Sequence, residues 1–235
     1  MAALREPACR IAVDVTFLRM DAPPWDERYA LPKGAVVQQV ERCSVAFYRY
    51  LYHTVGHDYV WWLRRTLPDA ELASLLVRPD ITIHVLYQGG EPAGFYELER
   101  RGDFGTNLAY FGLMPHAIGH GVGRALLRHA VDAAWAEPIR ALTVNTCTAD
   151  HPRALPNYTA AGFRVLRTVR EVWPVPLRLG LPIPDRLKIS PLWGALPPPR
   201  CLSRRASPSP MARPWPCPSP RRASPAARPS PCPSP

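Results

Sequence analysis

Three glycines at alternate positions, Gly119, Gly121 and Gly123, mark the part of this chain whose residue types and spacing could do chemistry. An apolar stretch precedes them, and apolar residues at three- and four-residue spacing follow them, as in a helix with one buried face. The first N–H groups of a helix have no partner inside it, and glycines leave them sterically uncovered. The helix dipole adds positive potential at that end. The stretch therefore predicts a strand–turn–helix that cradles an anion, with phosphate the usual one.

Spacing separates the families that use such a turn. A P-loop needs a lysine directly after its glycines, and none follows here. A Rossmann fingerprint needs a third glycine three residues after its second, where Arg124 or Leu126 stands, depending on the register. It also needs an acidic residue about 20 positions later, where the next apolar run ends Val144-Asn145-Thr146. Both alternatives fail on spacing.

The remaining match is the segment Ile118–Gly123, IGHGVG. It resembles the acetyl-CoA signature of the GNAT superfamily of N-acetyltransferases, a strand followed by [QR]-x-x-G-x-[GA] at a helix start. Ile118 departs from that signature, because it replaces the usual Gln or Arg. The resemblance implies that backbone amides from Gly119 to Arg124 hold the pyrophosphate of acetyl-CoA. The cofactor-binding residues that it implies are Leu113, Met114, Ile118, Gly119, His120, Gly121, Val122, Gly123 and Arg124.

A second motif lies at residues 151–163, HPRALPNYTAAGF, and is similar to the N-x-x-A-x-x-x-Y-x-x-x-G-F of the same superfamily. His151 stands where Asn is commoner. The resemblance implies that Tyr158 points at the sulfur of the cofactor and acts as general acid. A phenol with a pKa near 10 suits proton donation to a thiolate. A purely structural role for Tyr158, packed between helix and sheet, is the alternative.

The resemblance also suggests where the carbonyl and the amine are handled. The N–H of Leu113, at the end of the strand before the turn, is the candidate that polarises the thioester carbonyl. The glutamate that some members carry on this strand corresponds to Asn107, which cannot take a proton. Glu97, on the adjacent strand, is the remaining carboxylate, and its alternative is a solvated glutamate without a catalytic role. His116 and His120 are expected near phosphate or water, and a chain of waters could also serve as base.

The pattern of elements predicts an α/β (α+β) fold with a mixed, mostly antiparallel sheet flanked by helices. Strands are expected at residues 11–19, 35–40, 81–87, 93–101, 106–113, 140–146 and 163–172. Helices are expected from Ser44 to His53, from Asp69 to Val77, after the glycine turn, and at residues 152–161. This order resembles that of the acetyltransferases. The domain is expected to cover residues 1–178.

Aromatic residues gather before the first predicted hairpin, namely Tyr48, Tyr52, Tyr59, Trp61 and Trp62. The resemblance places them where the first two helices wall the acceptor site, so they could hold an amine by cation–π contact. Aromatic residues at helical spacing are more often part of a core. Both readings stay open.

Residues 179–235 are expected to form a disordered tail. Residues 176–235 carry +9 of the net charge of +10, since they hold 10 Lys/Arg and Asp185 alone, whereas residues 1–175 hold 19 Lys/Arg and 18 Asp/Glu. From Pro197 onward 14 of 39 residues are proline, which leaves too little apolar surface to fold. A dispensable extension is the favoured reading, and binding to nucleic acid or to a proline-recognising domain is the alternative.

Composition limits the classes of protein to which this chain can belong. No apolar run reaches the length of a membrane span, and no signal peptide is evident. Six cysteines without a C-x-x-C pair give neither a disulfide framework nor a zinc site, so a cytoplasmic protein without metal is expected. The resulting hypothesis is an N-acetyltransferase that moves the acetyl group of acetyl-CoA directly to an amine, with a homodimer left open. A CoA-binding protein without catalysis is the second hypothesis, and a nucleic-acid binder driven by its tail is the third. The sequence leaves the acceptor open among small amines, amino acids, antibiotics and protein amines.

Overall fold

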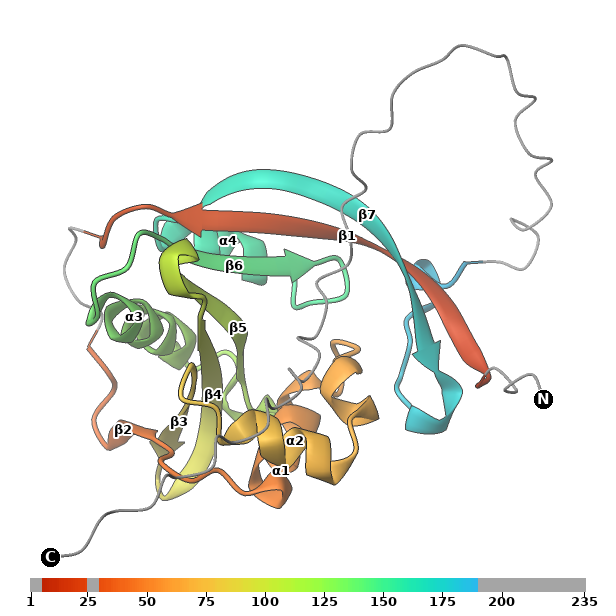
Figure 1. Ribbon diagram of the computed structural model, residues 1–235, viewed down its shortest axis with the longest axis horizontal. Coiled ribbons are helices and arrows are strands. Elements are labelled where there is room, and N and C mark those ends of the chain that lie inside the picture. The colour runs from red at the N-terminus through yellow and green to blue at the C-terminus, as the bar shows by residue number, and fades with distance from the viewer. Residues whose placement is uncertain (1–5, 25–29, 190–235) are drawn as a thin grey trace, which may run out of the picture. The chain divides into compact units, whose positions relative to one another are not determined.

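A single seven-stranded sheet organises the protein, seen here in a computed structural model that describes residues 6–24 and 30–189 (Figure 1). The strand order is β2-β3-β4-β5-β6-β1-β7, and all neighbours are antiparallel except β5 and β6. The strands are β1 Ala8–Met20, β2 Ala35–Gln39, β3 Ile81–Gln88, β4 Glu91–Arg100, β5 Thr106–Leu113, β6 Leu142–Cys147 and β7 Arg164–Pro176. The helices are α1 Val45–Gly56, α2 Asp69–Leu76, α3 Val122–Trp135 and α4 Ala154–Ala160. The predicted fold class, a mixed and mostly antiparallel sheet flanked by helices, is confirmed.

Local sequence signals account for most element boundaries. Ser44 caps α1, because its side-chain oxygen accepts a hydrogen bond from the Phe47 N–H at 3.2 Å. Gly89 and Gly90 join β3 to β4 with φ angles of 61° and 89°, a left-handed pair that glycine tolerates and that suits a tight hairpin. The predicted strand at residues 106–113 coincides with β5.

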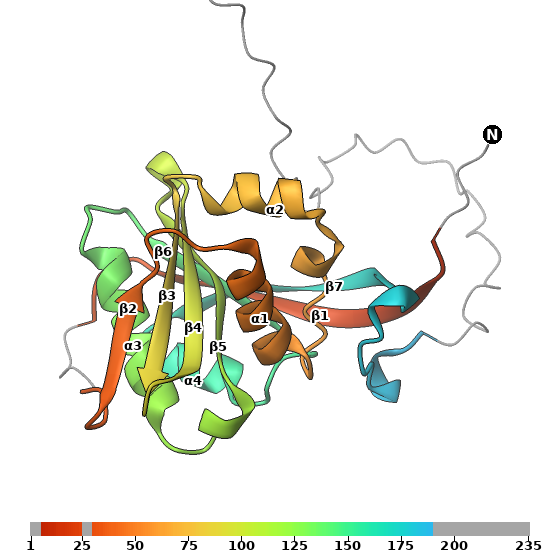
Figure 2. The ribbon, with the colours of Figure 1, turned by 90° about the horizontal axis from the view of Figure 1, so that it is seen from below.

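Two apolar layers cover the central strands. Figure 2 shows α1 and α2 on one side of β3–β5 and α3 on the other. On the α3 side, buried Leu126, Ala130 and Val131 of the helix pack in one cluster with Tyr158 of α4. On the other side, Leu51 of α1 packs with residues of α2, β3 and β4. Within the sheet that these layers cover, β5 and β6 pair over only three residues.

The place of the first strand in the sheet is not evident from the sequence. β1 lies between β6 and β7 and is antiparallel to both, with pairing that runs from Ala8–Pro176 to Met20–Leu142 (Figure 1). A third apolar cluster, which includes Ile11, Val13 and Val175, forms around this pair of long strands. The predicted range 11–19 therefore identified the strand but not its partners.

The packed part of the chain continues past the expected domain boundary at residue 178. Lys188 forms a β-bridge with Ile11, the Ile189 N–H donates to the Arg10 carbonyl at 3.0 Å, and Leu187 is buried. Leu187, with Leu181 and Ile183 beside it, packs in the apolar cluster around β1 and β7. The rest of the predicted tail, residues 190–235, lies outside the described residues. Within the described ranges, no helix combines the length and the apolar character that a membrane crossing needs.

Candidate active site

The site is built on a separation of the two parallel strands. β5 pairs with β6 only through Thr106, Asn107 and Leu108, although β5 continues to Leu113 and β6 to Cys147. A register shift opposite Glu97 and Leu98 leaves Ala109 as an extra residue in β5, and a bulge of this kind bends a strand. Figure 1 shows β5 turning away from β6 beyond this point. The last five residues of β5 therefore have a sheet edge that β6 does not cover.

Backbone directions place the N–H of Leu113 on this open edge. The Met114 N–H donates to the Ala93 carbonyl at 2.9 Å, so it points toward β4. Successive backbone groups of a strand point alternately to its two sides. The backbone groups of Leu113 and Phe111 accordingly point away from β4, into the gap left by β6. The predicted role of the Leu113 N–H as a carbonyl-polarising donor is compatible with this geometry.

The glycine turn has the properties of an anion cradle. Gly119 and Gly121 have φ angles of 90° and 79°, and a Cβ added at either would meet nothing within 4 Å, so the space above the turn is open. Gly121 is the N-cap of α3, and no side chain caps this helix end. The first-turn N–H groups are thus left for a ligand, which is the arrangement that favours phosphate.

The other predicted turn residues divide by burial. Ile118, His120 and Arg124 are exposed around the turn, so their side chains can reach a bound molecule. Met114 and Val122 are fully buried, and only their backbone can contribute. A Cβ at Gly123 would lie 3.3 Å from Leu113 Cδ1, so this glycine allows close approach of α3 to β5.

Tyr158 lies on the α3 side of the gap. Its ring packs edge-on against Phe111 of β5 and Phe163, with centroid distances of 6.2 and 5.9 Å. Burial and the negative charge of Asp150 raise the pKa of the Tyr158 phenol above its ordinary value. Since no described residue accepts or donates a hydrogen bond at its hydroxyl, this group is held in place by packing and stays protonated.

Asp150 is a residue that the sequence interpretation missed. It follows the end of β6, and its Oδ2 accepts hydrogen bonds from Thr146 Oγ1 at 2.8 Å and from the Cys147 N–H at 2.9 Å. Desolvation by burial raises the pKa of this carboxyl group. The negative charge of Asp150 also acts on Tyr158, so the end of β6 contributes to the electrostatics around that phenol. The sequence does show an aspartate between the end of a predicted strand and the second motif, and this position could have indicated a site residue.

Glu97, the predicted general base, is fully buried and already has partners. Its Oε2 accepts a hydrogen bond from the Tyr48 hydroxyl at 2.5 Å, and its Oε1 forms an ion pair with Arg64 Nη2 at 2.8 Å. Arg64 in turn lies 5.4 Å from the ring centroid of Tyr110. Glu97 is therefore not a solvated glutamate, and both of its oxygens anchor neighbouring side chains.

Comparison with known proteins agrees with this geometry. A profile described as the acetyltransferase (GNAT) family matches residues 45–163, about half of the chain and the part that holds the gap, the turn and Tyr158. The chain belongs to the GNAT family of acetyltransferases. A comparison with curated protein sequences gave no match.

Solved structures show the same fold at low identity. A GCN5-related N-acetyltransferase from Sphaerobacter thermophilus aligns with a TM-score of 0.50 and 16% identity, over 73% of this chain and 53% of that chain. A Drosophila protein aligns with a TM-score of 0.53 and 13% identity, over 73% and 54%. This GNAT chain thus spans about half the length of these structures, and the likeness concerns the fold.

The predicted aromatic cluster of this GNAT protein is divided between the core and the site. Tyr48 and Tyr52 are buried, which makes the core reading right for them. Trp61 is partly exposed and packs at 5.1 Å, centroid to centroid, from Tyr110 of β5. The remaining two residues face other parts of the protein. Trp62 packs on the cluster around β1 and β7, and Tyr59 contacts the His151 ring. Trp61 and Tyr110 therefore form the aromatic wall, on the α1 side of the gap.

Two glycines, Gly112 and Gly56, lie where the aromatic wall packs against the sheet, and neither position has room for a side chain. A Cβ added at Gly112 would lie 2.3 Å from Val55 Cγ1, and one added at Gly56 would lie 2.3 Å from Trp61 Cβ. These glycines let α1 and Trp61 approach β5 closely. Asn107, where some members carry a glutamate, is buried with its side-chain amide 3.0 Å from Thr143 Oγ1, so it ties β5 to β6.

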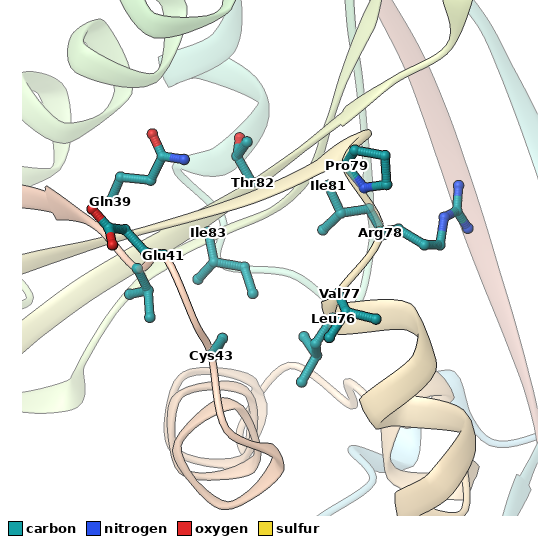
Figure 3. A pocket seen from close by; sticks show the side chains of 11 residues that line it. Gln39, Glu41, Cys43, Leu76, Val77, Arg78, Pro79, Ile81, Thr82 and Ile83 are labelled. Carbon is teal, nitrogen blue, oxygen red and sulfur yellow. The ribbon is translucent and has the colours of Figure 1, made fainter. Parts of the chain in front are cut away.

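A pocket elsewhere on the protein does not belong to this site. It has a volume of about 230 Å³ and lies between the end of β2, the end of α2 and the start of β3 (Figure 3). Cys43 lines it, and burial, with a contribution from Glu97, raises the pKa of this thiol to about 11, which disfavours a reactive thiolate. No residue of the turn, the β5 edge or the aromatic wall lines this pocket. Among the described residues, no group of three or more His, Cys, Asp or Glu is placed to hold a metal ion.

The glycine turn gives a first prediction. Gly121→Val should lower the affinity for acetyl-CoA about tenfold or more, because a β-branched residue at φ 79° forces the turn to move and misaligns amides that bind a charged group. Gly34→Val is the matched control, since Gly34 also has φ 79° and open space around it but lies at the start of β2. Calorimetric titration of both variants, with their melting temperatures, separates strain from binding. Equal affinities in folded variants would remove the turn from the site.

Proposed function

We propose that this GNAT protein transfers the acetyl group of acetyl-CoA directly to an amine. The observation that carries the proposal is the uncovered edge of β5, which leads into the uncapped, glycine-lined start of α3. An extended arm can pair with such an edge, while a pyrophosphate can bind the helix start. Both features lie on one continuous stretch, so a ligand with an arm and a pyrophosphate fits it. The open space above Gly119 and Gly121 supports that fit.

The backbone of β5 would bind and orient the thioester. The Leu113 N–H, directed into the gap, would donate a hydrogen bond to the thioester oxygen as negative charge develops on it. Because the donor belongs to a strand paired with β4, it is held in place before the reaction. The protein would therefore contribute a fixed N–H dipole, that of Leu113, to the polarisation of the thioester.

Protons need both a base and an acid. The ammonium form of the acceptor must lose two protons in total, of which one ends on the departing CoA thiol and one in solvent. Asp150 would take the first proton, because its desolvated carboxylate has a raised pKa and therefore holds a proton better than an exposed aspartate. Tyr158 would donate its hydroxyl proton to the sulfur as the C–S bond breaks, and the second amine proton would replace it.

The two groups are coupled by charge. The negative charge of Asp150 is one cause of the raised pKa of Tyr158. When Asp150 takes up a proton this charge disappears, so the pKa of Tyr158 falls and the phenol becomes a better donor. Deprotonation of the acceptor would thus prepare Tyr158 for the next step.

Glu97 would act on the acceptor side as a positioning residue. Its ion pair and its hydrogen bond hold Arg64 beside Tyr110 and fix Tyr48 of α1. Both oxygens of Glu97 are taken up by these two contacts, so this residue positions its neighbours. Trp61 and Tyr110 supply aromatic faces that could hold a cationic amine.

An acceptor screen tests the function. The full-length protein is mixed with acetyl-CoA and a panel of small amines, amino acids, aminoglycosides and lysine peptides, and released thiol is detected. Thiol release that requires an acceptor, with acetylated product confirmed by mass spectrometry, is the expected result. Tight binding of acetyl-CoA without transfer to any amine would favour the binding protein without catalysis. Absence of binding would contradict the proposal.

A further inference from the structure

The outer edge of β7 is long and unpaired among the described residues, and from Arg167 to Pro176 the strand is regular, since its bulge lies at Leu166. β7 runs for 13 residues, is last in the strand order and pairs only with β1 (Figure 1). Its exposed apolar side chains are Val165, Leu166, Val169 and Val172, which are 38–48% accessible. The opposite edge, β2, has only five residues. Proteins usually shorten or cover such edges, since an open one pairs with another strand.

The charges on β7 determine how it can pair with itself. Two copies of one strand that form an antiparallel pair are related by a two-fold axis perpendicular to the sheet. Directly opposite residues of an antiparallel pair point to the same face of the sheet. The axis must therefore pass midway between one residue and its own copy. An axis at Arg167, Arg170 or Glu171 places that charge against its own copy, which is destabilising. An axis at Thr168 brings no opposite charges together.

An axis through Val169 gives the complementary register. It sets Arg167 of each copy opposite Glu171 of the other and places Val169 against its own copy. Both charged side chains are already oriented, since Arg167 lies 5.0 Å from the ring centroid of Phe17 and Glu171 accepts a hydrogen bond from the Trp173 indole at 2.8 Å. Cross-strand pairs of opposite charge and of apolar residues both stabilise a sheet.

We propose that β7 is the dimer interface of this protein and that its partner is a second copy of the same chain. The two copies pair β7 with β7 about Val169, so that one sheet continues through both. Nothing in this pairing involves the acetyl-CoA site, and it stands independently of the proposed function.

Charge exchange tests the register. The full-length protein should be a dimer at micromolar concentration in analytical ultracentrifugation. Arg167→Glu and Glu171→Arg should each weaken the dimer about tenfold or more, because each places two like-charged pairs across the axis. The double variant restores opposite charges and should restore the dimer. Melting temperatures of the variants show whether they remain folded.

Cross-linking gives a test that does not depend on charge. Val169→Cys places two thiols opposite each other at the axis, at a Cα separation of about 4.5 to 5.5 Å that a disulfide can span. Mild oxidation should therefore yield a covalent dimer. Val172→Cys is the matched control, because it lies three residues from the axis and does not meet its own copy in this register, and the unaltered chain controls for the native cysteines. A monomeric protein, a dimer unaffected by both charge reversals, or equal cross-linking of the two cysteine variants would overturn the proposal.

Discussion

Tyr158→Phe is expected to lower the single-turnover rate of acetyl transfer by about 100- to 10,000-fold, the range typical of a general acid or base. The ring keeps its packing against Phe111 and Phe163, and only the hydroxyl is lost. Because this hydroxyl has no hydrogen-bond partner among the described residues, its removal should leave the melting temperature nearly unchanged. Affinity for acetyl-CoA should change little, since binding is assigned to the turn and the β5 edge.

A second buried tyrosine supplies the control. The Tyr96 hydroxyl lies 2.8 Å from His129 Nδ1 on the α3 side of β4, and its ring stacks on His84 of β3. Tyr96→Phe should therefore reduce stability by about 1 kcal/mol and leave the transfer rate intact. Single-turnover measurement is needed because slow product release would mask a loss in the chemical step. A Tyr158→Phe protein with an undiminished rate would reduce this residue to a packing role.

Asp150→Asn is expected to lower the transfer rate about 100-fold or more and to change its dependence on pH. A base works only when deprotonated, so the rate of the unaltered protein should rise with pH through the pKa of Asp150, which lies above the ordinary value of 3.8. The amide cannot titrate, and this rise should disappear in the variant. The raised pKa also means that the charged carboxylate costs folding stability above that pKa, so a neutral amide should not destabilise the fold at neutral pH.

The variant Glu97→Gln tests which of the two carboxylates, Glu97 or Asp150, acts as the base. If Glu97 were the base, the pH-dependent rise would be lost in this variant and kept in Asp150→Asn. We expect the reverse. Glu97→Gln leaves Arg64 without its carboxylate in a buried place, which should cost about 3–5 kcal/mol of stability. Comparison of pH–rate profiles for folded variants therefore distinguishes a base from a residue that positions its neighbours.

The predictable part of the site is the part encoded by neighbouring residues. The glycine turn, the start of α3 and the position of Tyr158 in α4 follow from local spacing, because a cap, a left-handed turn and a helical face are properties of a few consecutive residues. The helix expected to begin at Ser44 is confirmed for the same reason, since Ser44 caps α1.

The environments of the titratable side chains were not predictable in this way. The contacts that hold Glu97 come from Arg64 and Tyr48, in other parts of the chain, and the burial that raises the pKa of Asp150 comes from the folded surroundings. A single sequence gives the period of each strand but not which strands become neighbours. The same limit explains why the alternation at residues 11–19 could not indicate that this strand lies between two strands from the other end of the domain.

The position of β1 has a consequence for how the protein is made. The strand leaves the ribosome first, yet it cannot form its sheet contacts until residues 142–176 have been synthesised. During that interval a long apolar strand has neither of its neighbours, and closing it into the sheet requires contacts between the two ends of the domain. Topologies with such distant contacts fold slowly. We therefore expect β1 to join the sheet last, so that yield in the cell depends on chaperones that protect this strand until β6 and β7 exist.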